Sequence, residues 1–282
     1  MNRQGVTRAI VCAATLAAIA PSGATAAAHA KVVEPVWVTK RVAVPPGQTK
    51  SLTLRCPTRA VALNGTAPSA DSSIPGADAR RWTFRFARSG AATLRCVRLR
   101  LPRNVRGISI VVGTAFEPVV DVPPGLTQTI HVKCPAGQVP TGWGLERTGD
   151  ANGLSVAAAV PTAKGWSFVV ENTGPSGASG SLSARCLEKK QRARSGHRHS
   201  FATRVASFTE QLRADSTASR SCRSGEYSVA TGVSLPASAD VVLTGTALIG
   251  ARGAEWSFSR ADGATRVQTR LVCLARTTRF HR

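Results

Sequence analysis

Six cysteines divide most of the chain into three stretches that repeat one ordered pattern of residues. In each stretch an opening cysteine is followed by an apolar or aromatic residue, a glycine, a Trp-x-Phe triplet and a closing cysteine. Such an ordered recurrence predicts three copies of one structural unit. The third copy is the most divergent, because it lacks the Val-Pro-Pro-Gly run and the proline that flank the first two opening cysteines.

The residues around these cysteines alternate between apolar and polar, as in residues 52–56 and 130–134. Alternation with a period of two is typical of half-buried strands, and it places the cysteines on the apolar face. The 25 glycines and 16 prolines favour many turns and short strands. We therefore expect an all-β chain of three tandem, antiparallel, sandwich-like units.

The spacing predicts one disulfide inside each unit, because the chain carries an even number of cysteines beyond residue 30. Each bridge would join an early strand to the last strand and stabilise its unit by roughly 4 kcal/mol. Free buried thiols and bridges between units are the alternatives. The predicted pairs are Cys56–Cys96, Cys134–Cys186 and Cys222–Cys273.

The Trp-x-Phe triplets have two interpretations. Buried, they would fill the core of a small sandwich; exposed, they would form a platform on which carbohydrates stack. Their position on the apolar side of a strand favours the core. Trp143 lies outside the pattern, between Gly142 and Gly144, which indicates a close-packed strand. It is the aromatic residue to check first for exposure, and it is a candidate binding residue.

The order Cys-Pro-x-Gly…Gly-Trp-x-Phe…Cys, clearest from Cys134 through Trp166 to Cys186, resembles small β-modules of secreted actinobacterial proteins. The resemblance implies sandwich modules, and it implies no activity that could be assigned to this chain. The pattern is also similar to immunoglobulin-like Cys…Trp…Cys domains. In those domains the tryptophan lies soon after the first cysteine, whereas Trp166 lies nearer the second.

The first thirty residues predict an export signal. Arg3 and Arg8 precede the apolar run 9–20, and residues 28–30 offer a small-x-small cleavage pattern. The alternative, a membrane anchor, needs about twenty apolar residues. We expect a secreted or cell-surface protein without a membrane span. The predicted boundaries are 1–30 for the signal, 31–103, 104–188 and 203–277 for the units, 189–202 for a basic linker and 278–282 for a tail.

The formal net charge of +22 is concentrated in two regions. Residues 80–106 contain nine arginines and no acidic residue, and the run 189–199 is basic without apolar periodicity. A basic surface outside the cell favours anionic cell-wall polymers or glycans as partners. The alternative is that arginine supplies solubility and reflects the composition of the genome. The candidate binding residues are Arg81, Arg85, Arg98, Arg100, Lys189, Lys190, Arg192, Arg194 and Trp143.

The sequence contains none of the common catalytic or cofactor motifs: no Cys-x-x-Cys, His-Glu-x-x-His, Gly-x-Ser-x-Gly, phosphate-binding loop or dinucleotide fingerprint. We therefore predict a non-enzymatic protein without catalytic residues, cofactor or metal. No nucleic-acid-binding motif is present either, so no specific nucleic acid is expected. Two alternatives remain, an envelope hydrolase with carboxylates assembled between units and a passive structural spacer.

Overall fold

A computed structural model describes residues 31–100, 110–148, 153–192, 198–212, 215–236, 241–260 and 265–281. These residues form strands joined by turns, which confirms the predicted all-β class. The predicted signal, residues 1–30, lies outside the described residues. In the part of the chain that is described, no helix has the length and apolar character needed to cross a membrane.

Eighteen of the strands fall into three groups of six, here called units 1, 2 and 3. Unit 1 comprises β1 (Val32–Val42), β2 (Lys50–Arg55), β3 (Val61–Thr66), β4 (Ser72–Pro75), β5 (Arg81–Phe86) and β6 (Gly90–Arg100). Unit 2 comprises β7 (Val112–Val122), β8 (Thr127–Lys133), β9 (Gln138–Thr148), β10 (Leu154–Thr162), β11 (Gly165–Asn172) and β12 (Ala178–Glu188). Unit 3 comprises β15 (Thr203–Leu212), β16 (Ser216–Ser221), β17 (Glu226–Ser234), β18 (Val241–Ile249), β19 (Gly253–Arg260) and β20 (Thr265–Ala275).

The strands pair in the same antiparallel order in all three units. The sixth strand lies between the first and the third, and the fifth strand lies between the second and the fourth. Each unit therefore contributes two three-stranded layers, and its disulfide links them. The three bridges join the pairs predicted from the sequence, Cys56–Cys96, Cys134–Cys186 and Cys222–Cys273. Disulfides of this kind are typical of proteins in oxidising compartments.

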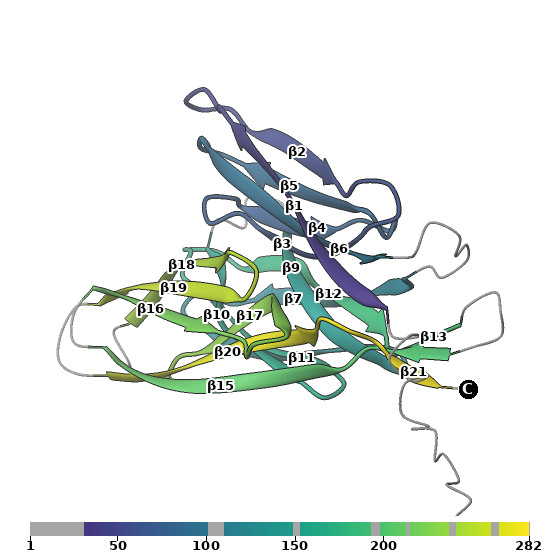
Figure 1. Ribbon diagram of the computed structural model, residues 1–282. Coiled ribbons are helices and arrows are strands. Elements are labelled where there is room, and N and C mark those ends of the chain that lie inside the picture. Colours follow the sequence, from purple (N-terminus) through teal and green to yellow (C-terminus); the bar gives the residue numbers. More distant parts are fainter. Residues whose placement is uncertain are drawn as a thin grey trace, which may run out of the picture.

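The units share sheets (Figure 1). Strand β4 of unit 1 pairs with β9 of unit 2, and β10 of unit 2 pairs with β17 of unit 3, so that two six-stranded sheets each span two units. The third junction is different, because β18 of unit 3 packs beside β3 of unit 1 without belonging to the same sheet. The three units therefore surround a common centre with two paired junctions and one unpaired junction.

The tryptophans of the three Trp-x-Phe triplets are buried in the core, as the strand alternation predicts. Trp82, Trp166 and Trp256 are at most 1% exposed. This burial excludes the alternative in which these three tryptophans form an exposed carbohydrate platform.

Within the predicted solvated linker 189–202, residues 190–192 and 198–200 form strands of a small sheet, and so do residues 279–281 of the predicted tail. Strand β13 (Lys190–Arg192) pairs with β14 (Arg198–Ser200), which pairs with β21 (Arg279–His281). The prediction was wrong because the polar side chains of this segment find partners inside the protein. Gln191 donates to the Glu188 carbonyl at 2.7 Å and accepts from the Val111 amide at 3.1 Å.

Candidate functional site

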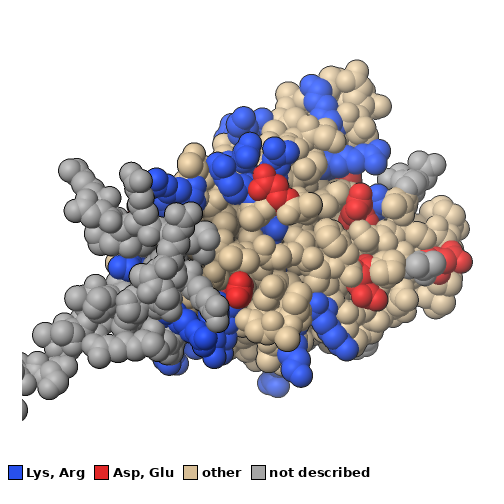
Figure 2. Space-filling model, turned by 90° about the vertical axis from the view of Figure 1, so that its right-hand side faces the viewer, with Lys and Arg blue, Asp and Glu red and all other residues tan. Residues whose placement is uncertain are grey.

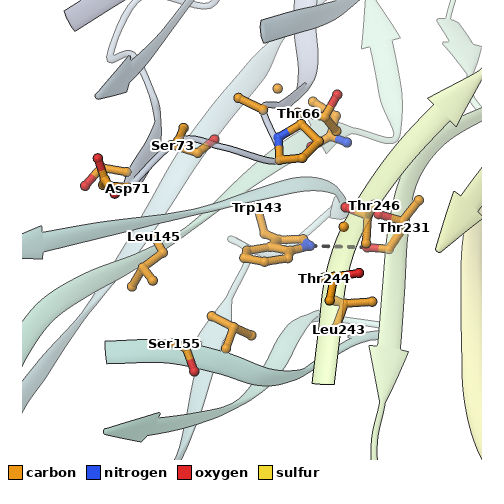
Figure 3. Close-up of a pocket in the computed structure, with 18 of the residues that line it drawn as sticks. Thr66, Asp71, Ser73, Trp143, Leu145, Ser155, Thr231, Leu243, Thr244 and Thr246 are labelled. Atoms are coloured by element: carbon orange, nitrogen blue, oxygen red, sulfur yellow. Dashed lines mark hydrogen bonds between the residues drawn. The ribbon is translucent and has the colours of Figure 1, made fainter. Parts of the chain in front are cut away.

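A cavity of about 250 Å³ lies where the third strands of the three units meet, beside the unpaired junction (Figure 3). We call it the junction pocket. Its wall comes from β3, the β3–β4 turn, β4, β9, β10, β17 and β18. Seven residues with hydroxyl groups line it, namely Thr66, Ser72, Ser73, Ser155, Thr231, Thr244 and Thr246. The hydroxyls of the three serines bond to Arg147, Trp82 and Glu171 of the protein itself.

Equivalent positions of the three units converge on this pocket. In the third strand of each unit, one residue pairs with the residue two before the closing cysteine. These residues are Gly65, Trp143 and Thr231, and all three line the pocket. Because unit 2 alone has an aromatic side chain at this position, a single indole ring lies at the meeting point of the units.

The Trp143 ring is held in one orientation and is only partly buried. Its Nε1 donates to the Thr231 carbonyl of unit 3 at 3.2 Å, shown as the dashed line in Figure 3. The ring of Phe168 meets it edge to face, with 5.5 Å between the centroids, and the Trp166 ring lies 6.3 Å away. The structure thus places Trp143 at the pocket wall.

The strand around Trp143 is close-packed, as predicted from its flanking glycines. A Cβ atom on Gly142 would lie 2.3 Å from the Leu63 carbonyl, and one on Gly144 would lie 2.0 Å from the Ser73 carbonyl. Both carbonyls belong to unit 1. The two glycines therefore let β9 approach the backbone of the neighbouring unit.

The pocket also contains a pair of opposite charges that sequence reasoning missed. Arg147 Nη1 lies 3.9 Å from Asp71 Oδ1, while its Nε donates to the Leu154 carbonyl at 2.6 Å. Burial lowers the pKa of Arg147, and the nearby Asp71 carboxylate opposes that shift. Asp71 Oδ2 is buried without a hydrogen-bond partner. No local pattern signals this pair, because Asp71 and Arg147 come from different units.

The four candidate binding arginines of unit 1 are divided between two sheets. Arg81 and Arg85 lie exposed on β5, where they alternate with buried aromatic residues. Arg98 and Arg100 lie on β6, which belongs to the opposite layer of unit 1. Strands β5 and β6 are consecutive, but the connection between them crosses from one layer to the other.

Arg98 is also engaged in an ion pair. Its Nε donates to Glu34 Oε2 at 2.9 Å, and this hydrogen bond holds the pKa of Glu34 below its ordinary value. Arg81 Nε lies 3.2 Å from Asp78, which also lies 3.7 Å from Arg55 on β2. Because Arg55 pairs with Arg81 across the strands, β2 and β5 bring a third arginine to the surface that carries Arg81 and Arg85.

The candidate residues of the basic run lie near β13. Lys189 and Lys190 are exposed, and Arg192 ends β13. Arg194 lies outside the described residues. Figure 2 shows the side of the molecule to which β13 and β21 belong, where Lys and Arg occur in several clusters with Asp and Glu among them.

Comparison with known proteins gives no family for this chain. It matches no protein-family model, and no curated protein matches it. The resemblance to small actinobacterial modules stays a prediction. Function is therefore argued from the site alone.

Proposed function

We propose that this protein is a secreted or cell-surface, non-enzymatic repeat protein that binds a carbohydrate in the junction pocket. The observation that carries the proposal is the partly exposed Trp143 ring, fixed by its bond to Thr231 in a pocket that threonines also line. The predicted export signal and the three disulfides support an extracellular location.

The chemistry of the pocket matches that of a sugar. A sugar ring has an apolar face of C–H groups, which packs on an aromatic ring, and a rim of hydroxyl groups, which both donate and accept hydrogen bonds. Ligand sites commonly combine an apolar surface with a few convergent polar groups. Trp143 supplies the surface, and threonines such as Thr66, Thr244 and Thr246 supply polar groups.

The charges in the pocket support binding rather than hydrolysis. Among the described residues that line it, Asp71 is the one carboxylate. Most glycoside hydrolases use two carboxyl groups, one as the acid and one as the base or nucleophile. We therefore favour a binding protein over the envelope hydrolase.

Two variants test the proposal on immobilised glycans. Trp143→Ala removes the aromatic surface, and Thr244→Tyr fills the pocket from an exposed position on β18. Both should reduce glycan retention by at least about tenfold, equivalent to 1.4 kcal/mol. Phe116→Ala and Thr217→Tyr are the matched controls, because Phe116 and Thr217 are exposed strand residues outside the pocket.

The two variants also separate a binding role from a packing role. Circular dichroism and thermal unfolding report whether Trp143→Ala still folds, and Thr244→Tyr does not depend on core packing. Retention that survives Thr244→Tyr would overturn the proposal. Failure of the unmodified protein to retain any glycan would favour the structural spacer.

A second candidate function, binding of an anionic cell-wall polymer, is favoured by the surface of β2 and β5. Arg55, Arg81 and Arg85 lie there, and Asp78 is the acidic residue in contact with two of them. We propose this surface, here called the arginine face, as the site for such a polymer. Co-sedimentation with cell walls at low and high salt tests it, because exposed charges are screened by salt.

A further inference from the structure

The two paired junctions share a glycine at one register position. Gly144 and Gly232 each pair with the residue three before the closing cysteine of their unit. A Cβ on Gly144 would lie 2.0 Å from the Ser73 carbonyl, and one on Gly232 would lie 2.6 Å from the Ala159 carbonyl. Glycine is therefore required where the fourth strand of the preceding unit pairs with β9 or β17.

In unit 1 the same register position is Thr66. It pairs with Thr93, three residues before Cys96. The strand that would come against it is β18, yet β18 pairs with β19 alone and β3 pairs with β6 alone among the described strands. A side chain thus replaces glycine at the one junction where the strands do not pair. The junction pocket lies there, with Thr66 and residues 243–246 in its wall.

We infer that Thr66 holds this junction open and that the pocket binds a neutral sugar, which bridges β3 and β18 in place of the missing strand pairing. The inference rests on the proposed carbohydrate function and specifies both the class of sugar and the origin of the site. The unpaired edges of two strands carry amide donors and carbonyl acceptors. Sugar hydroxyl groups can bond to both kinds of group.

The charges of the pocket indicate that the sugar is neutral, although the chain as a whole carries +22. Asp71 and Arg147 balance each other in the pocket wall. Because the two opposite charges lie side by side, a ligand carboxylate drawn to Arg147 would also face Asp71, and an ammonium group drawn to Asp71 would also face Arg147, so a charged sugar gains no net attraction over a neutral one.

The first test compares matched sugars. Glucose, galactose and mannose, their uronic acids and their 2-amino forms are titrated against the full mature chain, with saturation-transfer NMR and the thermal unfolding midpoint as readouts. At least one neutral hexose should bind about tenfold more tightly than its charged counterparts and raise the unfolding midpoint. Its affinity should be insensitive to salt.

The outcomes separate the inference from the proposed function. Tighter binding of a uronic acid or an amino sugar would overturn the neutral class and leave carbohydrate binding standing. Failure of all nine sugars, together with failure of immobilised glycans, would overturn both.

The second test addresses Thr66 itself. Thr66→Gly should let β18 pair with β3 and so slow amide hydrogen exchange at residues 243–246. It should also lower the affinity for the neutral hexose by at least about tenfold. Thr66→Val keeps the branched side chain without the hydroxyl and should leave exchange at β18 unchanged. Unchanged exchange in Thr66→Gly would overturn the role of Thr66, whatever the sugar binding shows.

Discussion

The guanidinium group of Arg95 in unit 1 donates to the carbonyl of Gly250 in unit 3, at 2.8 Å. Arg95 also donates to the hydroxyl of Ser228 at 2.7 Å. Arg185 has the same position in unit 2, directly before the closing cysteine, and donates to the Gly76 carbonyl of unit 1 at 3.1 Å. Two buried arginines thus connect their units to the loop between the fourth and fifth strands of the preceding unit around the centre. In unit 3 this position is Val272.

Replacing Arg95 by methionine should lower the free energy of unfolding by about 2–4 kcal/mol, because the carbonyl of Gly250 and the hydroxyl of Ser228 would lose their charged donor. Burial lowers the pKa of Arg95 to about 10, which reflects how little water reaches the group. Urea unfolding measures the loss. Arg88→Met, at an exposed position, is the control and should change stability by less than about 0.5 kcal/mol. Equal losses in the two variants would contradict the structural role of Arg95.

Acid should weaken the protein through Glu226. Arg204 donates to both carboxylate oxygens, at 3.0 and 2.6 Å, and these bonds hold the pKa of Glu226 below its ordinary value. A carboxyl with a lowered pKa in the folded state stabilises the fold above its unfolded pKa, and this stability is lost as the pH falls through the folded pKa. The stability difference between the unmodified protein and Glu226→Gln should therefore shrink in acid. Glu117→Gln removes the same charge at an exposed site and is the matched control.

Gly144→Ala should destabilise the protein by about 1–3 kcal/mol, since the new Cβ would collide with the Ser73 carbonyl and separate β4 from β9. Gly113→Ala is the control, because its Cβ would meet the end of the flexible Gln138 side chain at 3.3 Å. Thermal unfolding compares the two. A smaller loss for Gly144→Ala than for Gly113→Ala would be inconsistent with the close approach of the units.

Charge removal can separate the arginine face from the other predicted arginines. The double variant Arg81→Gln, Arg85→Gln should elute from a polyphosphate resin at lower salt than the unmodified protein. A protein with fewer cations in contact with the resin releases fewer counterions when it binds, so it binds more weakly. The double variant Arg98→Gln, Arg100→Gln removes the same charge from the other layer of unit 1, outside the arginine face. It should elute later than the first variant. Identical elution of both would mean that net charge alone sets the binding.

The buried tryptophans follow from local alternation, and the disulfide pairs follow from the recurring spacing of the cysteines, which is why both could be predicted. In β5 the residues Trp82, Phe84 and Phe86 point to one side and Arg81 and Arg85 to the other. A period of two specifies the face of each residue whatever the strand pairs with.

The alternation of polar and apolar residues does not predict the burial of Arg95 and Arg185. As charged residues on strands they would be expected at the surface, but carbonyl groups of a neighbouring unit cover them. The segment 189–202 was misjudged for the same reason, because its polar groups bond to residues distant in sequence.

By itself, the sequence determined the all-β class, the three disulfide pairs and the core role of the Trp-x-Phe triplets, since each depends on spacing within one strand or one unit. Only the tertiary structure decided that units share sheets, that Arg81 and Arg98 lie in different layers and that Asp71 meets Arg147 beside Trp143. Each of these relationships depends on how strands distant in the sequence are arranged. No local pattern encodes which strands pair, either within a unit or across units.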